Sequence, residues 1–234
     1  MTQHIGAPEP SRTDGDFREP MRFPNLRAAG RQLAPALDAW RNISDLLVLG
    51  IALGGMPVAR EVATHLRAPL DLILIRWLLA PQGPGSMLCA VNVAGTRILD
   101  DEINLSNAPS TPVEHFLADA IAGLDRREQI CRRKRPRIEL SGRTAILVDC
   151  AIRTGSTMKA AIGALRKMEP GRVIGAVPVA SLEGYAAVVD LFDELVCLAQ
   201  PKNFGNAGVW YRDFSRPDDD HVGGLLEDLP GLRS

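Results

Sequence analysis

The fold of this chain is decided by one stretch, which reads Thr144-Ala145-Ile146-Leu147-Val148-Asp149-Cys150-Ala151-Ile152-Arg153-Thr154-Gly155-Ser156-Thr157. Its first part is a short apolar run that closes with an acid, which is typical of a strand buried on both faces of a parallel sheet. From Met158 to Leu165 the apolar residues return at the spacing of one helical face. The stretch therefore predicts a strand, a tight polar turn and a helix.

The polar turn between this strand and this helix has the composition of a phosphate site. It offers a glycine, hydroxyl groups, a guanidinium and the unpaired N–H groups of a helix start. Hydrogen bonds to a charged acceptor contribute about 1.5–3 kcal/mol each, more than the roughly 0.3–1 kcal/mol of the helix dipole. Asp149 ends the strand and is expected to face the crevice in which parallel sheets bind ligands, where it can accept from sugar hydroxyls. The alternative is an ordinary turn whose Ser and Thr side chains cap the helix.

The stretch resembles the phosphoribosyl pyrophosphate signature of type I phosphoribosyltransferases, which is an apolar strand, two adjacent acids and Thr-Gly-x-Thr. Cys150 stands where the second acid would be. By this resemblance Asp149 holds the ribose hydroxyls and stabilises positive charge on the ring, and Cys150 lies on the same ribose side. The resemblance also implies a 5-phosphate site formed by Arg153, Thr154, Gly155, Ser156 and Thr157.

Length and composition favour a single domain in a cytoplasmic protein. The chain has 234 residues and 46% hydrophobic content, enough for one full α/β domain. A net charge of -1 gives no global attraction to nucleic acid or to an anionic membrane. No apolar run approaches the ~20 residues of a membrane span, and the polar, proline-containing amino terminus does not resemble a signal peptide. We therefore expect a cytoplasmic protein with no membrane partner.

The cysteines and histidines do not predict a metal centre. The four cysteines and four histidines are scattered and lack any metal-ligand spacing. We expect no metal held by direct protein ligation and read the cysteines as reduced thiols.

Alternating strands and helices define the fold class. Strands are expected at 46–52, 72–75, 144–149, 173–179 and 195–198, with one or two more within 88–99, and helices at about 25–37, 58–66, 111–135, 158–165 and 183–189. This order predicts an α/β fold with a Rossmann-like, mainly parallel sheet flanked by helices and right-handed crossovers. We expect a disordered leader at 1–20, one phosphoribosyltransferase-like domain at 21–216 and a C-terminal tail at 217–234.

A glycine pair follows the first strand, in Ala52-Leu53-Gly54-Gly55-Met56-Pro57-Val58-Ala59. This run is similar to the Pro-Arg-Gly-Gly-Val-Pro-Val-Ala loop of a group of bacterial phosphoribosyltransferase-domain proteins. The resemblance implies that Gly54, Gly55 and Arg76 face the pyrophosphate. Two expected cations are absent, because Leu53 replaces the loop arginine and Trp77 replaces the lysine after Arg76. Trp77 either fills the core or stacks on a base.

Three further segments carry open interpretations. Residues 100–107 form a polar loop after the strands expected within 88–99, and in phosphoribosyltransferases this general region contains a small hood or mobile flap over the reacting centre. The basic end of the helix at 111–135 either binds RNA or is a solvated terminus, and the near-neutral chain favours the second. The aromatic cluster at 204–214 either sandwiches an acceptor base or packs the carboxyl terminus against the sheet. Its candidate acceptor-binding residues are Asn203, Phe204 and Trp210.

The resemblance as a whole implies an enzyme. It would bind phosphoribosyl pyrophosphate with a substrate-bridged Mg²⁺ and transfer the ribosyl 5-phosphate to a nitrogen nucleophile, a base being one option, with release of pyrophosphate. Homodimers are usual for this fold. The departures at Leu53, Trp77 and Cys150 keep two alternatives open: a non-catalytic regulatory protein that binds a nucleotide or ribose 5-phosphate, and a transferase or lyase with an altered phosphosugar donor.

Overall fold

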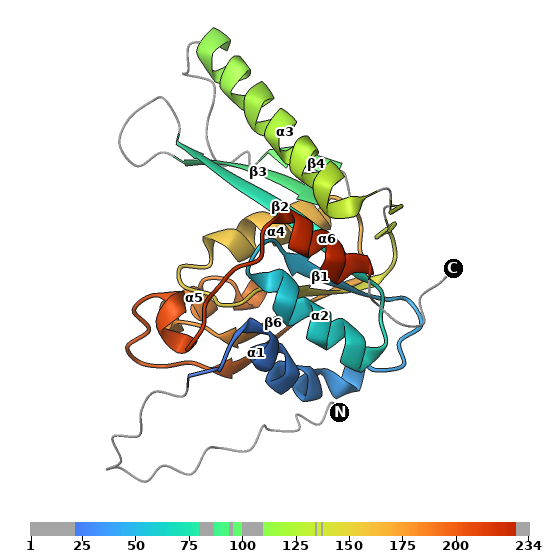
Figure 1. The fold of residues 1–234 in the computed structure, drawn as a ribbon, viewed down its shortest axis with the longest axis vertical. Coiled ribbons are helices and arrows are strands. Elements are labelled where there is room, and N and C mark those ends of the chain that lie inside the picture. Colours follow the sequence, from blue (N-terminus) through green and yellow to red (C-terminus); the bar gives the residue numbers. More distant parts are fainter. Residues whose placement is uncertain are drawn as a thin grey trace.

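The computed structural model describes residues 22–79, 87–93, 96–99, 110–133, 135–136 and 138–227 (Figure 1). The expected leader at 1–20 and the polar loop at 100–107 lie outside the described residues. The described part is built on one seven-stranded sheet of strand order β4-β3-β2-β1-β5-β6-β7.

Most of the sheet is parallel. The parallel strands are β1 (Leu46–Ile51), β2 (Leu70–Leu79), β5 (Thr144–Val148), β6 (Arg172–Val179) and β7 (Glu194–Ala199). An antiparallel pair, β3 (Met87–Val93) and β4 (Thr96–Leu99), continues the sheet beyond β2. The expected class, a mainly parallel α/β sheet flanked by helices, is confirmed. The apolar run around 88–99 gives two strands, since both β3 and β4 pair in the sheet.

The central strand β1 sets where the two decisive turns lie. Every residue of β1 is buried, and Gly50 pairs with Leu72 of β2 on one side and with Val148 of β5 on the other. In a parallel pair the carboxyl ends lie at the same edge of the sheet. The turn after β1 and the turn after β5 are therefore neighbours in space.

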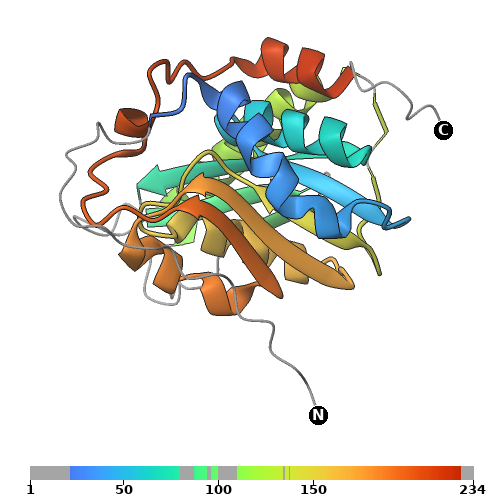
Figure 2. The same ribbon diagram turned by 90° about the horizontal axis from the view of Figure 1, so that it is seen from below.

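Helices cover both faces of the sheet (Figure 2). On one face lie α1 (Leu26–Leu33), the 3₁₀ helix η1 (Ala34–Trp40), α2 (Gly55–Leu66) and α6 (Asp219–Glu227). On the other lie α4 (Ser156–Arg166), α5 (Leu182–Ala186) and the 3₁₀ helix η3 (Val189–Leu191). Successive residues of β1 belong to opposite cores, because Val48 packs with the first group and Leu47 and Leu49 with the second. This is the reason why the strand reads as a continuous apolar run.

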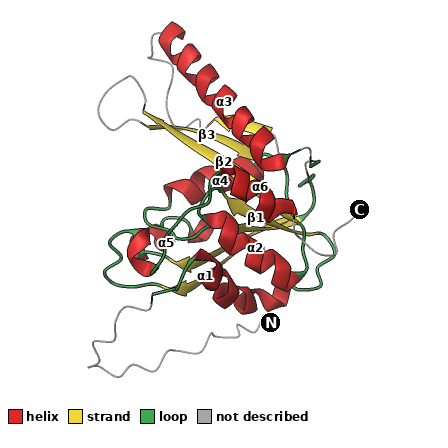
Figure 3. Ribbon diagram, in the orientation of Figure 1, coloured by secondary structure: helices red, strands yellow, loops and turns green. Residues whose placement is uncertain are grey.

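The termini of the helices follow local sequence signals. Asn25 caps α1, since its side-chain oxygen accepts a hydrogen bond of 2.8 Å from the N–H of Ala28. The helix expected at 183–189 is divided into α5 and η3, with Ser181 as the cap of α5. The long helix α3 (Ser110–Arg132) projects along the β2–β3 hairpin (Figure 3).

The segment after residue 216 adds a helix to the core. Val222, Leu225 and Leu226 of α6 are buried, and Arg127 of α3 donates hydrogen bonds of 2.9–3.1 Å to Asp219 at the start of α6. The basic end of α3 thus holds α6 in place. A second arginine of α3 forms a buried ion pair with the sheet: Nη2 of Arg132 lies 2.8 Å from Oδ1 of Asp71 on β2. Among the described helices, none combines the length and apolar character required to cross a membrane.

The buried Arg132–Asp71 pair generates a stability prediction. Burial raises the pKa of Asp71 above its ordinary value, and the Arg132 guanidinium opposes this shift. We expect Arg132→Met to lower the free energy of unfolding by about 3–5 kcal/mol, because it leaves the buried carboxyl groups of Asp71 and Glu128 without their shared cation. Urea denaturation measures the change.

The neighbouring Arg133 provides a matched control. Its side chain is 44% exposed and pairs with Glu227 and Asp220 at 3.4 and 3.5 Å. Arg133→Met is expected to change the free energy of unfolding by less than about 1 kcal/mol. Equal losses in the two variants would contradict the assignment of a stabilising role to the buried pair.

Candidate functional site

A pocket of about 560 Å³ opens at the carboxyl ends of β1 and β5. Its walls come from the β1–α2 turn (51–54), the β5–α4 turn (149–158), Ile75 of β2 and the C-terminal segment (206–208, 214 and 216). The two turns predicted from the sequence to bind one ligand therefore share one cavity.

The β5–α4 turn is shaped around Gly155. This residue has φ of 83°, in the left-handed region, and a Cβ there would lie 2.6 Å from Cγ1 of Val188. Gly155 is the N-cap of α4, and no side chain caps the helix. The hydroxyls of Thr154 and Ser156 instead contact each other at 3.0 Å. The capping alternative is therefore wrong for this turn, and the first N–H groups of α4 are available to a ligand.

The turn is held in place from the α5 side, by a residue that the sequence did not single out. The hydroxyl of Ser181 donates a hydrogen bond to the carbonyl of Arg153 and accepts one of 2.8 Å from the N–H of Gly184. The N–H of Ser181 also donates to the carbonyl of Ile152 at 2.8 Å. These bonds fix the backbone while the side chains of Arg153, Thr154 and Ser156 remain exposed.

Asp149 is the buried acid of the pocket. The residue is 9% exposed, and its Oδ1 accepts a hydrogen bond of 2.7 Å from the N–H of Cys150. Burial raises the pKa of Asp149 to about 6, against the opposing effects of that hydrogen bond and of the Arg216 guanidinium. Burial also raises the pKa of the Cys150 thiol well above its ordinary value, so Cys150 is neutral at pH 7.

The glycine pair permits close approach of the β1–α2 turn to β5. A Cβ at Gly54 would lie 2.9 Å from Sγ of Cys150, and a Cβ at Gly55 would lie 2.7 Å from the carbonyl oxygen of Val148. Gly54 lines the pocket, whereas Gly55 packs against β5 behind it. The peptide bond between Ala52 and Leu53 is cis. Gly54 and Cys150 are therefore direct neighbours at the centre of the site.

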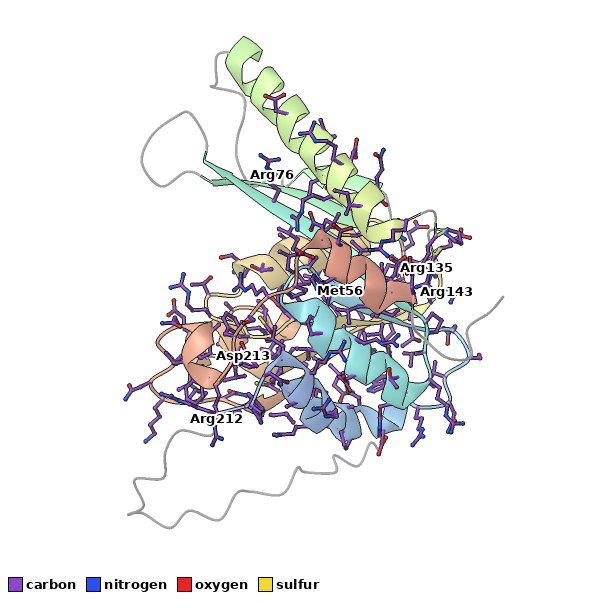
Figure 4. All side chains as sticks on the ribbon, in the orientation of Figure 1. Met56, Arg76, Arg135, Arg143, Arg212 and Asp213 are labelled. Carbon is purple, nitrogen blue, oxygen red and sulfur yellow. The ribbon has the colours of Figure 1, made fainter. Side chains whose placement is uncertain are left out.

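Arg76 is not brought to the pocket. Its side chain is exposed on β2 and lies against α3, where a Cβ added to Gly123 would collide with its guanidinium (Figure 4). Its neighbour Ile75 lines the cavity instead. The pyrophosphate role of Arg76 was implied by the resemblance, with Arg76 at the end of a strand; in the structure β2 continues to Leu79, and the Arg76 side chain lies against α3. The side chain of Trp77 lies outside the described residues.

The candidate acceptor-binding residues do not line the pocket. Phe204 and Trp210 are 6% and 7% exposed, and the Trp210 Nε1–H donates a hydrogen bond of 2.9 Å to the carbonyl of Phe204. Asn203 is exposed outside the cavity. The acceptor interpretation of Phe204 and Trp210 is corrected to the packing alternative, because the two rings complete the core and Trp210 satisfies its polar group there.

Other residues of the C-terminal segment reach the pocket, among them Asn206, Phe214 and Arg216. The hydroxyl of Tyr211 donates to the carbonyl of Cys150, which fastens this segment to the end of β5. Arg216 is the last residue of the domain expected at 21–216, and the sequence did not single it out as a site residue. The sequence offered one signal for Arg216: it is a positively charged residue two positions after Phe214, where the aromatic cluster ends.

The described residues provide no group of three His, Cys, Asp or Glu side chains that could hold a metal ion. Asp149 is the one carboxylate among the described residues that line the pocket. A divalent cation in this site would depend on oxygens of its ligand and on water, which suits Mg²⁺.

The fold and the site define an α/β protein with a phosphate-type turn at the carboxyl edge of a parallel sheet. The chain belongs to the family described as "Phosphoribosyl transferase domain", whose model matches residues 23–213. It is 39% identical over 209 residues to two Mycobacterium tuberculosis proteins, of strains CDC 1551 and H37Rv, each named "Putative phosphoribosyl transferase". The match covers 88% of this chain and 46% of each relative, so the chain spans about half their length.

A solved structure extends the comparison. The crystal structure of TT1426 from Thermus thermophilus is 35% identical, with a TM-score of 0.76, over 90% of this chain and 100% of that one.

The raised pKa of Asp149 generates a pH-dependent prediction. Between pH 3.8 and about 6 the native state retains a proton that the unfolded state has released, so stability falls as the pH rises through this window. Asp149→Asn removes this effect and keeps an acceptor for the Cys150 N–H. We expect the variant to be more stable than the wild type by up to about 3 kcal/mol at pH 7.5, with the difference vanishing near pH 3.8.

Urea denaturation at both pH values measures the difference. Asp190→Asn changes an exposed carboxyl in η3 and serves as the control, with a difference near zero at each pH. A destabilised Asp149→Asn protein at pH 7.5 would show that the ionised carboxylate stabilises the native state.

Proposed function

We propose that this chain binds phosphoribosyl pyrophosphate with Mg²⁺ and transfers its ribosyl 5-phosphate to a nitrogen nucleophile. The observation that carries the proposal is the shared pocket, in which the uncapped start of α4 and the buried Asp149 lie at one end of β5. The bond between ribose C1 and the pyrophosphate oxygen breaks, and the acceptor nitrogen forms a bond to C1 and loses its proton.

The β5–α4 turn suits the 5-phosphate. The N–H groups of α4 that follow Gly155 lack intrahelical partners. The same pocket is lined by three hydroxyl residues and one cation of this turn, namely Thr154, Ser156, Thr157 and Arg153. Because the backbone is fixed by Ser181, these donors need little rearrangement to bind an anion.

Asp149 suits the ribose. With a pKa of about 6 it is ionised at neutral pH, and its remaining lone pairs can accept from the ribose hydroxyls. In the transition state positive charge develops on the ring, and a buried carboxylate stabilises such charge more strongly than a solvated one. Mg²⁺, held by ribose and pyrophosphate oxygens, would offset charge on the leaving group.

A second candidate function is supported by the wall of the pocket that the β1–α2 turn forms, opposite the β5–α4 turn. Arg76 lies against α3 and Leu53 is apolar, so the β1–α2 turn carries no cation of its own. A protein whose β1–α2 turn lacks a cation can still bind the 5-phosphate of a nucleotide or of ribose 5-phosphate, without catalysing transfer of the ribosyl group.

Isothermal titration separates the two functions. Phosphoribosyl pyrophosphate and ribose 5-phosphate are titrated in parallel in the presence of Mg²⁺, followed by a screen of nitrogenous acceptors for released pyrophosphate. Tighter binding of the pyrophosphate form together with pyrophosphate release supports the transferase. Equal binding of both ligands, without release for any acceptor, supports the binding protein.

The 5-phosphate site generates a mutational prediction. Thr154→Ala combined with Thr157→Ala is expected to weaken binding of both phosphosugars at least tenfold, because a hydrogen bond to a charged acceptor contributes about 1.5–3 kcal/mol. Thr64→Ala is the control, since its hydroxyl donates to the carbonyl of Arg60 on the exposed side of α2. Unchanged calorimetric affinity in the double variant would remove the anchor of the proposal.

A further inference from the structure

We propose that Arg216 binds the pyrophosphate group of the phosphosugar, opposite the 5-phosphate turn. This assignment rests on the proposed function and supplies the cation that the β1–α2 turn lacks. It makes the C-terminal segment part of the substrate site.

Arg216 lies over the glycine turn. Its Nε is 3.6 Å from the position that a Cβ of Gly54 would occupy, and Sγ of Cys150 is 2.9 Å from the same position. Leu53, Gly54 and Arg216 all line the cavity. The Arg216 guanidinium therefore lies next to the backbone of the β1–α2 turn, because Gly54 has no side chain to separate them.

An aromatic stack fixes the position of Arg216. Its guanidinium carbon lies 4.9 Å from the centroid of the Phe214 ring, which lies 5.1 Å from Tyr211, which in turn lies 5.5 Å from Phe23. Backbone hydrogen bonds join the two chain segments, from Phe23 N–H to the Trp210 carbonyl at 2.8 Å and from Arg212 N–H to the Phe23 carbonyl at 2.9 Å. The stack thus extends from the buried core to the mouth of the pocket.

The donors of Arg216 are available to a ligand. No carboxylate of the described residues forms an ion pair with Arg216, and its side chain is exposed. A guanidinium that stacks on a ring by its face keeps its N–H groups in the plane, where they match phosphate oxygens in pairs. The contact with Phe214 orients the N–H groups of the Arg216 guanidinium, and a phosphate group of the ligand would accept their hydrogen bonds.

The distribution of charge in the pocket indicates a ligand with two anionic groups. Among the described lining residues the cations are Arg153, on the β5–α4 turn, and Arg216, beside Gly54. The Arg216 guanidinium opposes the rise in the pKa of Asp149, so its field reaches the ribose side of the same cavity. A ligand with a phosphate at one end and a pyrophosphate at the other satisfies both cations, whereas ribose 5-phosphate satisfies only the first.

The test compares Arg216→Gln with Arg212→Gln. Arg212 belongs to the same segment (Figure 4), carries the same charge and is exposed. It does not line the pocket. Each protein is titrated calorimetrically with phosphoribosyl pyrophosphate and with ribose 5-phosphate, both with Mg²⁺. We expect Arg216→Gln to weaken binding of the pyrophosphate form at least tenfold and of ribose 5-phosphate less than twofold, and Arg212→Gln to change neither more than twofold.

The remaining outcomes overturn the assignment in distinguishable ways. Equal losses for both ligands in Arg216→Gln would overturn the assignment of Arg216 to the pyrophosphate, because the substitution would then affect the 5-phosphate interaction as well. No loss for either ligand would overturn the role of Arg216 and leave the 5-phosphate site intact. Equal affinity of the wild type for both ligands would have the same meaning. Binding of neither ligand by the wild type would overturn the proposed function itself and the Arg216 assignment with it.

Discussion

The parallel pairing of β1 with β5 is the constraint on which the site depends. Because Gly50 lies opposite Val148, the two strands end together and their following turns meet at one edge of the sheet. The approach is so close that Gly54 and Gly55 have no room for a Cβ against Cys150 and Val148. A glycine pair that resembles a phosphate loop in the sequence is thus required first by packing, since a side chain at either position would collide with the end of β5.

The C-terminal segment completes this edge through contacts between distant parts of the chain. Phe23 and Tyr211 form a parallel bridge, and the Tyr211 hydroxyl donates to the carbonyl of Cys150. One aromatic residue therefore connects the amino-terminal segment, the end of β5 and the cation at Arg216. Its ring contacts Phe23 and Phe214, and its hydroxyl donates to the Cys150 carbonyl, so several of the few aromatic residues of this chain take part in one set of contacts.

Local patterns predicted the sheet and the β5–α4 turn because both are encoded within short windows: apolar strands, a left-handed Gly155 and an amphipathic helix. The direction of Arg76 could not be predicted in this way, since it depends on α3, which packs on β2 from far along the sequence. The same holds for Trp210, whose buried hydrogen bond to Phe204 decides between core and pocket. Arg216 was missed because its place depends on a stack that begins at Phe23.

The departures at positions 53 and 150 are best understood together. By the resemblance described in the sequence analysis, Leu53 would stand in place of a positive charge and Cys150 in place of a negative one, and both residues line the cavity together with Gly54. A second carboxylate at position 150 would lie buried beside Asp149, whose own pKa is already raised by burial, and two such acids would not both ionise without another cation nearby. A neutral thiol at 150 avoids that repulsion in a wall where position 53 is apolar. The changes at positions 53 and 150 thus offset each other in charge, whereas Trp77, in place of the expected lysine, leaves the site with one positive charge fewer than the resemblance implies.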